Sequence, residues 1–438
     1  MFRRILIANR GEVAARVART CRRLGIEVVA CTTEPDKDLQ WLAEADFVAN
    51  LGGRTGYLDM DTILAAARRH ACSAVHPGWG FLSENALFAT RCEAERISFI
   101  GPTPAAIRAM GDKSVAKATM KRMGLPLIPG SDGPVLDAAH ARTVADAIGY
   151  PVLLKARSGG GGRGMRRVEA ASEVEGAFNQ ASAEAHSAFG DGALYLEKLI
   201  ERGRHIEFQV MGDTYGDLVC LGERECSVQR RHQKLIEESP SPALDAGTRA
   251  RMSAEVAAAC QRAGYVGAGT VEMLRDDDGR IYFMEMNTRL QVEHPVTEMV
   301  TGVDLVEQQL RVAAHERLAL QPMASGHAIE CRINAEDPDQ DFKPAPGRVS
   351  MLRFATGEGV RVDTHLREGD TISPHYDSLI AKIITHGPDR ETAILRMEAA
   401  LRGTQVEGVP TTIGFHLRVL AHPEFRAGTY DTGLVARM

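Results

Sequence analysis

The first hundred residues alternate short apolar runs with longer segments that carry an apolar stripe. The short runs are strand-like: "RILIA", "IEVVACT", "SAVHPG" and "ISFIG". Between them, "GEVAARVARTCRRLG" and "ILAAARRH" have helical periodicity. This βαβ rhythm predicts a parallel, doubly wound sheet, the nucleotide-binding type. The loop after the first strand is "ANRGE" and not GxGxxG, which argues against a nicotinamide-dependent dehydrogenase.

The composition is that of an ordinary globular protein. Of the 438 residues, 44% are hydrophobic and 25% are charged, which excludes a disordered or fibrous chain. At about 100–200 residues per domain, two to four domains are expected. The net charge of −6 gives no electrostatic reason to expect nucleic acid or an anionic membrane as a partner. No apolar run reaches the roughly 18 residues of a membrane span, so we expect no membrane contact.

Cysteine usage predicts a reducing compartment. The eight cysteines form neither a CxxC motif nor a Cys/His cluster, which is typical of free thiols, so we expect a cytoplasmic protein. The Arg-rich start of the chain could suggest a transit peptide. Because Glu12 interrupts it and the segment from Ile5 to Ala8 has the pattern of a buried strand, the structural interpretation is favoured.

The middle of the chain changes character. "GDKSVAKATMKRMG" predicts a helix stopped by Gly124 and Pro126, and residues near 130–200 form a separable unit that contains the strand "ALYLEKLI". After it, "HIEFQVMG" and "GDLVCLGERECSVQRR" predict strands of an antiparallel sheet. A further segment with a mixed pattern starts near Ser325.

Four consecutive glycines, Gly159 to Gly162, separate a strand that ends at Lys155 from one that begins near Met165. Glycine backbones can approach a phosphate closely and turn their N–H groups toward it, while Lys155 adds a positive charge. The segment predicts a flap over a triphosphate, although a flexible hairpin tip would have the same pattern. It is not a P-loop, because GxxxxGK[ST] is absent.

The stretch "TVEMLRDDDGRIYFMEMN" predicts a hairpin that brings two acids together. If Asp278-Gly279 is a two-residue loop, or if four residues loop over the same centre, Glu272 lies directly opposite Glu285. Opposed like charges are destabilising, so a cation is expected between them. Asn287 would share their face, and Mg²⁺ prefers such oxygen ligands. The alternative is a solvated sheet face on which neighbouring Arg or Lys residues offset the two acids.

The run that follows suggests an anion clamp beside a base. In an extended segment, Arg289 and Gln291 could hold a small oxyanion, with Glu293 next to them as a general base. Next to a nucleotide and a metal, this arrangement suggests acyl-phosphate chemistry. A salt-bridged loop explains the spacing equally well.

Other polar residues allow two interpretations each. His205 is either a nucleotide ligand or an ordinary buried histidine, and Arg332 either stabilises an oxyanion or pairs with Glu330 or Glu336. A short basic run either lines a phosphate cavity or is a solvated surface; it comprises Gln229, Arg230, Arg231, His232 and Lys234.

A series of motifs in a fixed order is far more specific than any one of them. The series is "IANRGEVA", "HPGWGFLSEN", "FIGP", "MGDK", "GGGGRGM", "RHIEFQV", "ERECSVQRRHQK", "GAGTVEM", "FMEMNTRLQVEHPVTEM", "GHAIECRINAEDP" and "YDSLIAK". It resembles the biotin carboxylase family of ATP-grasp enzymes over essentially the whole chain.

The resemblance implies a mixed α/β and α+β architecture built on an ATP-grasp fold. A Rossmann-like pre-ATP-grasp domain would span residues 1–110, and the ATP-grasp domain residues 111–322, with a glycine-rich lid at about 130–200. A C-terminal biotin carboxylase domain at 325–438 would complete the site.

The resemblance also implies a role for each motif residue. The ATP-binding set is Lys113, Lys155, Gly159, Gly160, Gly161, Gly162, Glu197, Lys198, Leu199, His205, Gln229, His232, Glu272 and Glu285. The metal ligands would be Glu272, Glu285 and Asn287, and bicarbonate would bind to Arg289, Gln291, Val292 and Glu293. Arg332 and Trp79 would contact biotin. Glu293, Arg289, Arg332 and Lys234 would form the catalytic group.

The implied reaction is the carboxylation of biotin. MgATP, or MnATP, with two metal ions would phosphorylate bicarbonate to carboxyphosphate, and its breakdown would carboxylate biotin on a separate biotin carboxyl carrier protein. With a carboxyltransferase subunit, this is the first half-reaction of acetyl-CoA carboxylase, in fatty acid biosynthesis, or of another acyl-CoA carboxylase. A homodimer is expected. Trp79 replaces the usual Tyr, and Arg157-Ser158 replace small residues before the glycines, so the biotin and lid contacts are expected to differ in detail.

Two alternatives remain, one within enzymes and one from another class. Another ATP-grasp ligase that acts through an acyl phosphate would need the lid and the metal ligands, but not the clamp of Arg289, Gln291 and Glu293 together with Arg332. A noncatalytic nucleotide-binding subunit would not need Glu293 for its function.

Overall fold

The computed structural model describes residues 1–156, 165–321 and 323–438 and divides the chain into two units. The larger unit comprises Met1–Leu125, Arg204–Met273 and Glu285–Met438, and the smaller comprises Pro126–Gly203 and Leu274–Met284. No helix in the described ranges is both long and apolar enough to span a bilayer.

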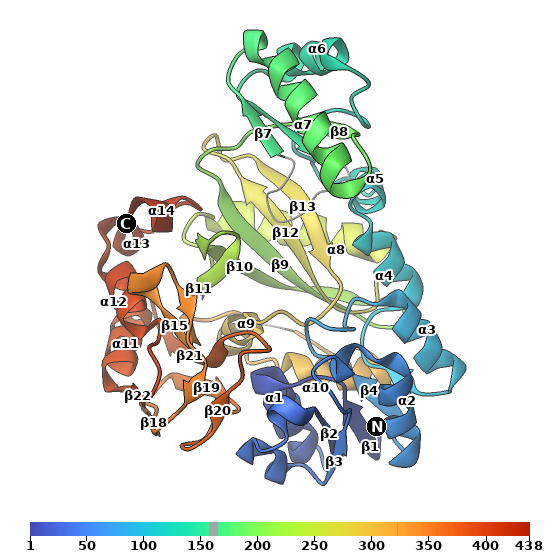
Figure 1. Ribbon diagram of the computed structural model, residues 1–438, viewed down its shortest axis with the longest axis vertical. Helices are drawn as coiled ribbons and strands as arrows, with labels where there is room; N and C mark the ends of the chain where they lie inside the picture. The colour runs from blue at the N-terminus through green and yellow to red at the C-terminus, as the bar shows by residue number, and fades with distance from the viewer. Residues whose placement is uncertain (157–164, 322) are drawn as a thin grey trace. The chain divides into compact units, whose positions relative to one another are not determined.

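A five-stranded parallel sheet opens the larger unit, as the βαβ pattern predicted (Figure 1). Its strands, in the spatial order β3-β2-β1-β4-β5, are β1 (Arg4–Ile7), β2 (Glu27–Thr32), β3 (Phe47–Asn50), β4 (Ala74–His76) and β5 (Ser98–Phe99). Every pairing among them is parallel. The central strands carry fully buried side chains such as Leu6 and Val29, because each face of the sheet is covered.

The helices of this region are α1 (Gly11–Arg23), α2 (Met60–Arg69), α3 (Ala86–Ala94), α4 (Pro104–Gly111) and α5 (Lys113–Arg122). Four of the five, α2 to α5, begin at capping residues that sequence reasoning can recognise. Side-chain oxygens of Asp59, Asn85, Thr103 and Asp112 accept hydrogen bonds from backbone N–H groups of the first turns. The predicted helix before Gly124 is therefore confirmed as α5.

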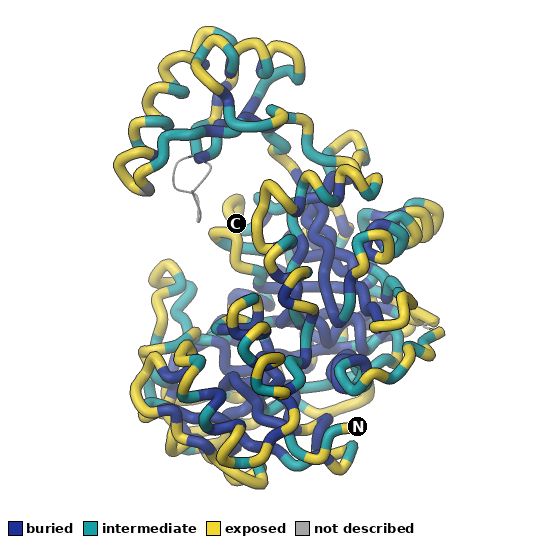
Figure 2. Tube along the Cα trace, turned by 90° about the vertical axis from the view of Figure 1, so that its right-hand side faces the viewer, coloured by how far each residue is buried: buried dark blue, intermediate teal, exposed yellow. Residues whose placement is uncertain are grey.

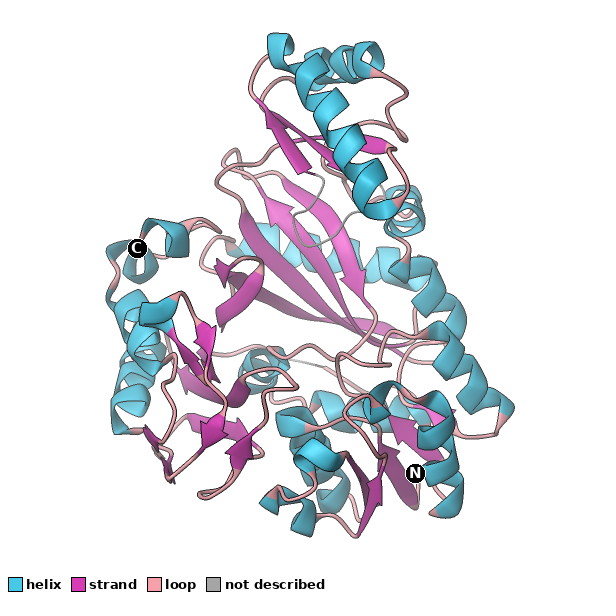
Figure 3. Cartoon of the chain, in the orientation of Figure 1, coloured by secondary structure: helices cyan, strands magenta, loops and turns pink. Residues whose placement is uncertain are grey.

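An eight-stranded sheet forms the centre of the larger unit (Figure 3, magenta). In the spatial order β13-β12-β9-β10-β11-β14-β21-β19, its strands are β9 (Arg204–Gly212), β10 (Leu218–Arg230), β11 (Gln233–Ser239), β12 (Gly267–Arg275), β13 (Ile281–Asn287), β14 (His327–Asn334), β19 (Val360–Thr364) and β21 (Leu379–Gly387). The pairings from β9 through β10, β11, β14 and β21 to β19 are antiparallel, as predicted for β9 and β10.

Helices and short strands cover this sheet and complete the C-terminal region. The helices are α8 (Ala246–Arg262), α9 (His294–Thr301), α10 (Leu305–Ala313), α11 (Arg390–Gly403), α12 (Ile413–Ala421), α13 (Pro423–Ala427) and α14 (Leu434–Arg437). The short strands are β15 (Glu336–Asp337), β16 (Lys343–Pro344), β17 (Gly347–Arg348), β18 (Met351–Arg353), β20 (Thr371–Ile372) and β22 (Gln405–Glu407).

The strands of this sheet are largely buried (Figure 2, dark blue), and they carry many charged side chains. Eight charged side chains on its strands are fully buried: Glu207, Arg224, Glu225, Glu237, Glu238, Glu330, Asp363 and Lys382. A buried charge is costly unless it is paired or neutralised, so their partners define where the chemistry of this unit lies.

The smaller unit is a three-stranded antiparallel sheet with two helices. Its elements are α6 (Ala138–Ile148), β6 (Val152–Ala156), β7 (Met165–Val168), α7 (Val174–Phe189) and β8 (Leu194–Lys198), and its strand order is β7-β6-β8. The predicted strands around Lys155, Met165 and "ALYLEKLI" are confirmed. The glycine flap at Gly159–Gly162, with Arg157 and Ser158 before it, lies outside the described residues.

The turn between β12 and β13 differs from the prediction. The Asp276 N–H donates to the Arg280 carbonyl at 2.8 Å and the Gly279 N–H donates to the Asp276 carbonyl at 3.1 Å, so three residues form the loop. Gly279 has a φ of 85°, as in a type I turn followed by a G1 bulge. The predicted two- or four-residue loop is therefore wrong. The Asp276 carboxylate also accepts from the Arg280 N–H at 2.8 Å, which stabilises this closure.

All eight cysteines are free thiols, as predicted. Seven are buried and Cys220 is half-buried. Burial raises the pKa of every one of these thiols, so they remain protonated at neutral pH.

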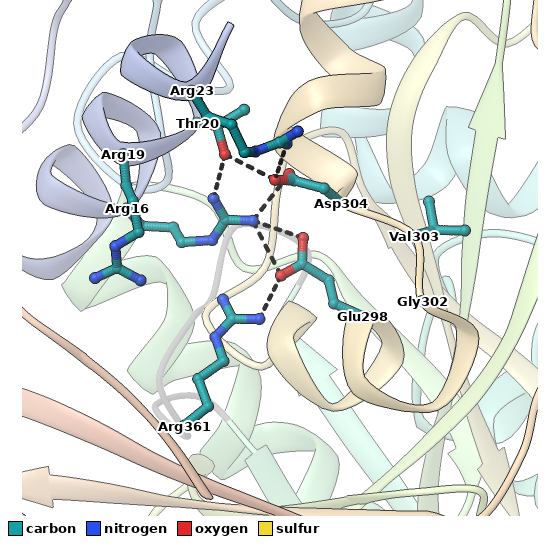
Figure 4. Close-up of a pocket in the computed structure, with 9 residues that line it drawn as sticks. All are labelled: Arg16, Arg19, Thr20, Arg23, Glu298, Gly302, Val303, Asp304 and Arg361. Atoms are coloured by element: carbon teal, nitrogen blue, oxygen red, sulfur yellow. Dashed lines mark hydrogen bonds and ion pairs between the residues drawn. The ribbon is translucent and has the colours of Figure 1, made fainter. Parts of the chain in front are cut away.

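Ion pairs in the larger unit join segments that are distant in sequence (Figure 4). Arg16 on α1 contacts Glu298 on α9 at 2.8 Å and Asp304 at 2.9 Å. Arg361 on β19 reaches the same Glu298 at 2.7 Å. These side chains line a cavity of about 380 Å³.

Candidate active site

Lys234, near the start of β11, lies among three carboxylates. Its Nζ is 2.6 Å from Glu207, 3.0 Å from Glu272 and 2.5 Å from Glu293. Burial alone would disfavour its charge, but the three acids raise the pKa of Lys234 well above its ordinary value. Lys234 is thus a fixed cation at the centre of the site.

Glu293, the residue before α9, lies between two cations. One carboxylate oxygen contacts Lys234, and the other accepts from Arg332 Nη2 at 2.9 Å. Burial would raise the pKa of Glu293, but Lys234, Arg332 and Arg224 lower it well below its ordinary value. Glu293 is therefore an ionised carboxylate at neutral pH, as a general base must be.

Glu272, on β12, is held ionised in a similar way. His205 Nε2 lies 3.1 Å from one of its oxygens, and Gln291 Nε2 donates to the other at 3.2 Å. Burial opposes ionisation, but Lys234 and His205 lower the pKa of Glu272 below its ordinary value. The same Glu272 charge raises the pKa of His205 against the effect of burial.

Asn287 and Glu285 lie on the same side of the sheet as Glu272. Asn287 Nδ2 donates to Glu272 Oε1 at 2.8 Å, so these side chains share a face. Glu285 is two residues before Asn287 in an extended strand and projects to that face too. Lys113 Nζ lies 3.6 Å from Glu285 Oε2. Oxygen donors from three side chains therefore gather here in spite of the different turn.

Arg289 and Gln291 form a connected pair. Arg289 Nη1 donates to Gln291 Oε1 at 2.9 Å, and Nη2 donates to Asn287 Oδ1 at 3.0 Å. Arg289 Nε also lies 2.9 Å from Glu84 Oε2, and this contact helps to fix the guanidinium. The clamp expected from the sequence is assembled, and it is continuous with Glu272 through Gln291.

Val292 and Trp79 are linked through two buried charges. The Val292 carbonyl accepts from Lys382 Nζ at 2.8 Å, and Lys382 lies 3.1 Å from Glu12 Oε2. The Trp79 Nε1–H donates to Glu12 Oε1 at 3.2 Å. The backbone beside the clamp is therefore supported by Lys382 from behind.

A fully buried arginine holds the carboxylate behind Lys234. Arg224 Nε donates to Glu207 Oε1 at 2.6 Å, while its Nη1 donates to Gln209 at 2.8 Å and to Thr297 at 3.0 Å. Glu207 is thereby fixed between Arg224 and Lys234.

Gln229 and His232 come shortly before Lys234 in the sequence. Gln229 on β10 pairs directly with Lys234 on β11. His232 lies in the exposed turn between these strands, with a φ of 65°. Gln229 is thus the cross-strand neighbour of Lys234, whereas His232 projects from a turn.

The smaller unit contains its own cluster of the expected residues. Lys155 Nζ contacts Glu197 Oε2 at 2.5 Å, across the pair of strands β6 and β8. Lys198 Nζ donates to the carbonyls of Gly149 and Tyr150 at 3.1 and 2.8 Å. The Leu199 N–H donates to the Pro151 carbonyl at 3.1 Å.

Several polar residues of the site were not predicted. They are Glu12, Glu84, Glu207, Arg224, Glu237 and Lys382. The sequence did contain a signal for Lys382, because a lone lysine within "LIAKII" cannot stay in a buried strand without an anion. The same signal is present for Glu207 in "HIEFQV".

The donor set near Glu272 fits a hard divalent cation. Glu272, Glu285 and Asn287 offer carboxylate and amide oxygens, the ligands that Mg²⁺ and Mn²⁺ prefer. His205, Glu207 and Glu272 also offer ligand atoms within 4.8 Å of one another. Lys234 lies against two of these three residues, and its charge makes a cation less favourable on that side.

Comparisons with known proteins show which family the chain belongs to. Family models match nearly the whole chain: the biotin carboxylase N-terminal domain at residues 1–107, the carbamoyl-phosphate synthase L chain ATP-binding domain at 112–321 and the biotin carboxylase C-terminal domain at 330–437. A biotin carboxylase of Nostoc sp. is 53% identical, with 100% of this chain and 99% of that protein covered.

Two solved structures of biotin carboxylases also match the chain over its full length. The biotin carboxylase of Campylobacter jejuni, solved as a complex named for β,γ-ATP, is 46% identical with a TM-score of 0.94, and 100% of this chain and 99% of that chain are covered. The biotin carboxylase domain dimer of Hydrogenobacter thermophilus 2-oxoglutarate carboxylase, solved with MgADP, ADP and bicarbonate, is 46% identical with a TM-score of 0.92, and the coverage is 100% and 98%.

The fold and the site together define an ATP-grasp enzyme. Because family models and a relative 53% identical over full length match it, the chain belongs to the biotin carboxylase family.

Proposed function

We propose that the protein carboxylates biotin with bicarbonate at the expense of ATP, giving ADP and phosphate. The observation that carries this proposal is the position of Glu293. An ionised carboxylate held between Lys234 and Arg332, at 2.5 and 2.9 Å, next to the Arg289–Gln291 pair, suits a base acting on a small bound anion.

The nucleotide-binding residues are proposed as the resemblance implies. They are Lys113, Lys155, Gly159–Gly162, Glu197, Lys198, Leu199, His205, Gln229 and His232, with Glu272 and Glu285 toward its phosphates. Glu272, Glu285 and Asn287 would hold Mg²⁺ or Mn²⁺, as two ions. When bound, the metal would neutralise part of the phosphate charge.

The first step is the activation of bicarbonate. Arg289, Gln291 and the Val292 backbone N–H orient the anion, and Glu293 accepts its proton. The resulting oxygen attacks the γ-phosphorus of ATP, the bond to the β-phosphate oxygen breaks, and ADP and carboxyphosphate form. Lys234 keeps Glu293 in place and offsets charge that develops nearby.

The second step transfers carbon dioxide to biotin. Carboxyphosphate breaks into carbon dioxide and phosphate, and the phosphate removes the N1′ proton of biotin. Negative charge then develops on the ureido oxygen, where Arg332 stabilises it before N1′ attacks carbon dioxide. Trp79 is proposed to contact biotin where related enzymes usually have tyrosine.

The wider setting of the reaction is also proposed. Biotin is carried by a biotin carboxyl carrier protein, and a carboxyltransferase subunit of acetyl-CoA carboxylase, or of another acyl-CoA carboxylase, uses the product. The protein acts as a homodimer in the cytoplasm, where eight free thiols are stable. The functional division is residues 1–110, 111–322 with the lid at about 130–200, and 325–438.

The test is ATP hydrolysis measured with and without bicarbonate, free biotin and EDTA. The proposal expects turnover that depends on bicarbonate and the metal, is stimulated by biotin and yields carboxybiotin from labelled bicarbonate. Turnover that ignores bicarbonate but responds to another carboxylate would contradict the proposal and favour a different ATP-grasp ligase. Copurification with a biotinylated carrier tests the partner.

A further inference from the structure

Two buried glutamates face each other behind Arg332. Glu237 on β11 is paired directly with Glu330 on β14, and both side chains are 0% exposed. Directly opposed side chains have Cβ atoms about 4.5–5.5 Å apart, so two negative charges here would repel each other strongly.

The hydrogen bonds of this pair are incomplete. Glu237 Oε1 accepts from Arg332 Nε at 2.7 Å. Among the described residues, the other Glu237 oxygen and both Glu330 oxygens have no hydrogen-bond partner. Three of four carboxylate oxygens are therefore buried without a donor, which is costly if both groups are ionised.

Nearby cations are too few to neutralise both charges. Arg332 is shared with Glu293 at 2.9 Å, and Lys382 contacts Glu12 at 3.1 Å. The titratable and charged groups that face the pair are Lys234 on β11, Cys331 and Arg332 on β14, Lys382 on β21, Cys226 on β10, Glu12 on α1, and Glu293 just before α9. Together with Glu237 and Glu330, this set holds four carboxyl groups but only three cations, Lys234, Arg332 and Lys382.

We propose that Glu237 and Glu330 together hold one exchangeable proton, and that Glu237 is a positioning residue for Arg332 whose charge behind the guanidinium changes when that proton is lost. The proton comes from solvent and returns to it. This inference rests on the proposed function, because it assigns Arg332 to the oxyanion of biotin.

Glu237 is expected to titrate near neutral pH. Burial, together with the nearby Glu293 charge, raises the pKa of Glu237 to about 7 in spite of Arg332, and burial raises the pKa of Glu330 well above its ordinary value. Ionisation of Glu237 adds a negative charge behind Arg332 and weakens the stabilisation of an oxyanion in front of it. The contribution of Arg332 to biotin carboxylation therefore falls as the pH rises through neutrality.

The first test measures kcat/KM for free biotin against pH in the wild type and in E237Q, E330Q and E238Q, at a temperature at which circular dichroism shows each to be folded. The ratio of E237Q to wild type is expected to rise by about threefold or more from about pH 6 to about pH 8. E330Q replaces the opposed carboxyl by an amide that can donate a hydrogen bond to ionised Glu237, so it is expected to move the inflection down by about one pH unit or more.

E238Q is the matched control. Glu238 is a buried neighbour on the same strand that contacts His327, Arg390 and Tyr430 instead, so E238Q is expected to keep the wild-type inflection. A constant ratio for E237Q, or an unmoved inflection in E330Q, would overturn the proposal. E330Q decides alone if E237Q does not fold.

A second measurement does not depend on activity. A carboxyl with a raised pKa stabilises the folded state below the unfolded pKa and loses that contribution as the pH rises through the folded value. The Tm of E237Q minus that of wild type should therefore increase from about pH 4.5 to about pH 7. A flat difference would refute the shared proton even in an active carboxylase. A wild type without biotin-dependent turnover but with this pH dependence would refute only the proposed function.

Discussion

Individual residues in this site are defined mainly by their partners. Glu293, Glu272 and Glu207 surround Lys234, and each acid also has a second cationic partner: Arg332, His205 or Arg224. Arrangements of this kind fix side chains in place before a ligand binds, because a buried charge cannot leave its partner cheaply. The position of each group then follows from its neighbours more than from its own strand.

Replacement of Glu293 by Gln removes the base while its shape is preserved. Bicarbonate-dependent ATP turnover should fall about 100-fold or more, the usual contribution of a general base. Steady-state kinetics would measure the change. ATP binding measured by calorimetry should remain, and E255Q on α8, a half-buried glutamate paired with Arg251, serves as the control. Wild-type turnover in E293Q would contradict the assigned role.

Glu238 provides a pH test of stability. Burial opposes its ionisation, but His327 and Arg390 lower the pKa of Glu238 to about 2. A carboxyl whose pKa is lowered by folding stabilises the folded state at pH values above its pKa in the unfolded chain. This contribution is lost as the pH falls through its pKa in the folded protein. E238Q should therefore lose about 3 kcal/mol near pH 7 and much less near about pH 3.

Chemical denaturation of E238Q and wild type at several pH values measures this difference. An equal loss of stability at both extremes of pH would show that packing, and not charge, explains the effect.

At the scale of elements, hydrophobic periodicity predicted strands and helices well. The parallel strands β1 to β5 and the antiparallel strands β9 and β10 lie where their apolar patterns placed them. The turn at Asp276–Arg280 was predicted incorrectly, because three consecutive aspartates and a glycine allow loops of two, three or four residues. The side chain of Asp276 decides among them by accepting the Arg280 N–H, and the pattern of residue types does not show which of the three aspartates makes this local hydrogen bond.

Gly279 is required by the observed turn. Because its φ is 85°, G279A should cost about 1–2 kcal/mol of unfolding free energy in the smaller unit. Hydrogen exchange of the turn amides, or urea denaturation, measures the cost. Gly133 lies in the same unit with open space around its Cβ position and no positive φ, so G133A is the control. Equal effects of the two variants would contradict the bulge.

At the scale of the whole chain, buried ion pairs connect segments that are hundreds of residues apart. Arg16 and Glu298 expose only 4% and 5% of their side chains, whereas Arg23, near the same cavity, exposes 53%. The sequence indicated where Glu293 and Arg332 lie but not Glu12, Arg224 or Lys382, because their partners come from other strands and helices. Sequence patterns identify local elements and known motifs, and they miss charges that are satisfied only after folding.

The depth of these pairs predicts how they respond to salt. R16M leaves Glu298 with one fewer cation and should cost about 3–5 kcal/mol at both low and high ionic strength. R23A removes an exposed pair and should have a small effect that disappears in high salt. Thermal unfolding at two salt concentrations measures both. Strong screening of the R16M effect would show that Arg16 is accessible to solvent.

The buried, protonated thiols have a practical consequence. A thiol reagent in neutral buffer should label the native protein slowly, since seven cysteines are buried, Cys220 is half-buried and all eight thiols are held protonated. Each cysteine that becomes labelled records an opening of the segment around it. Mass spectrometry of the labelled peptides could therefore map, position by position, which parts of the chain open first under heat or denaturant, without any engineered probe.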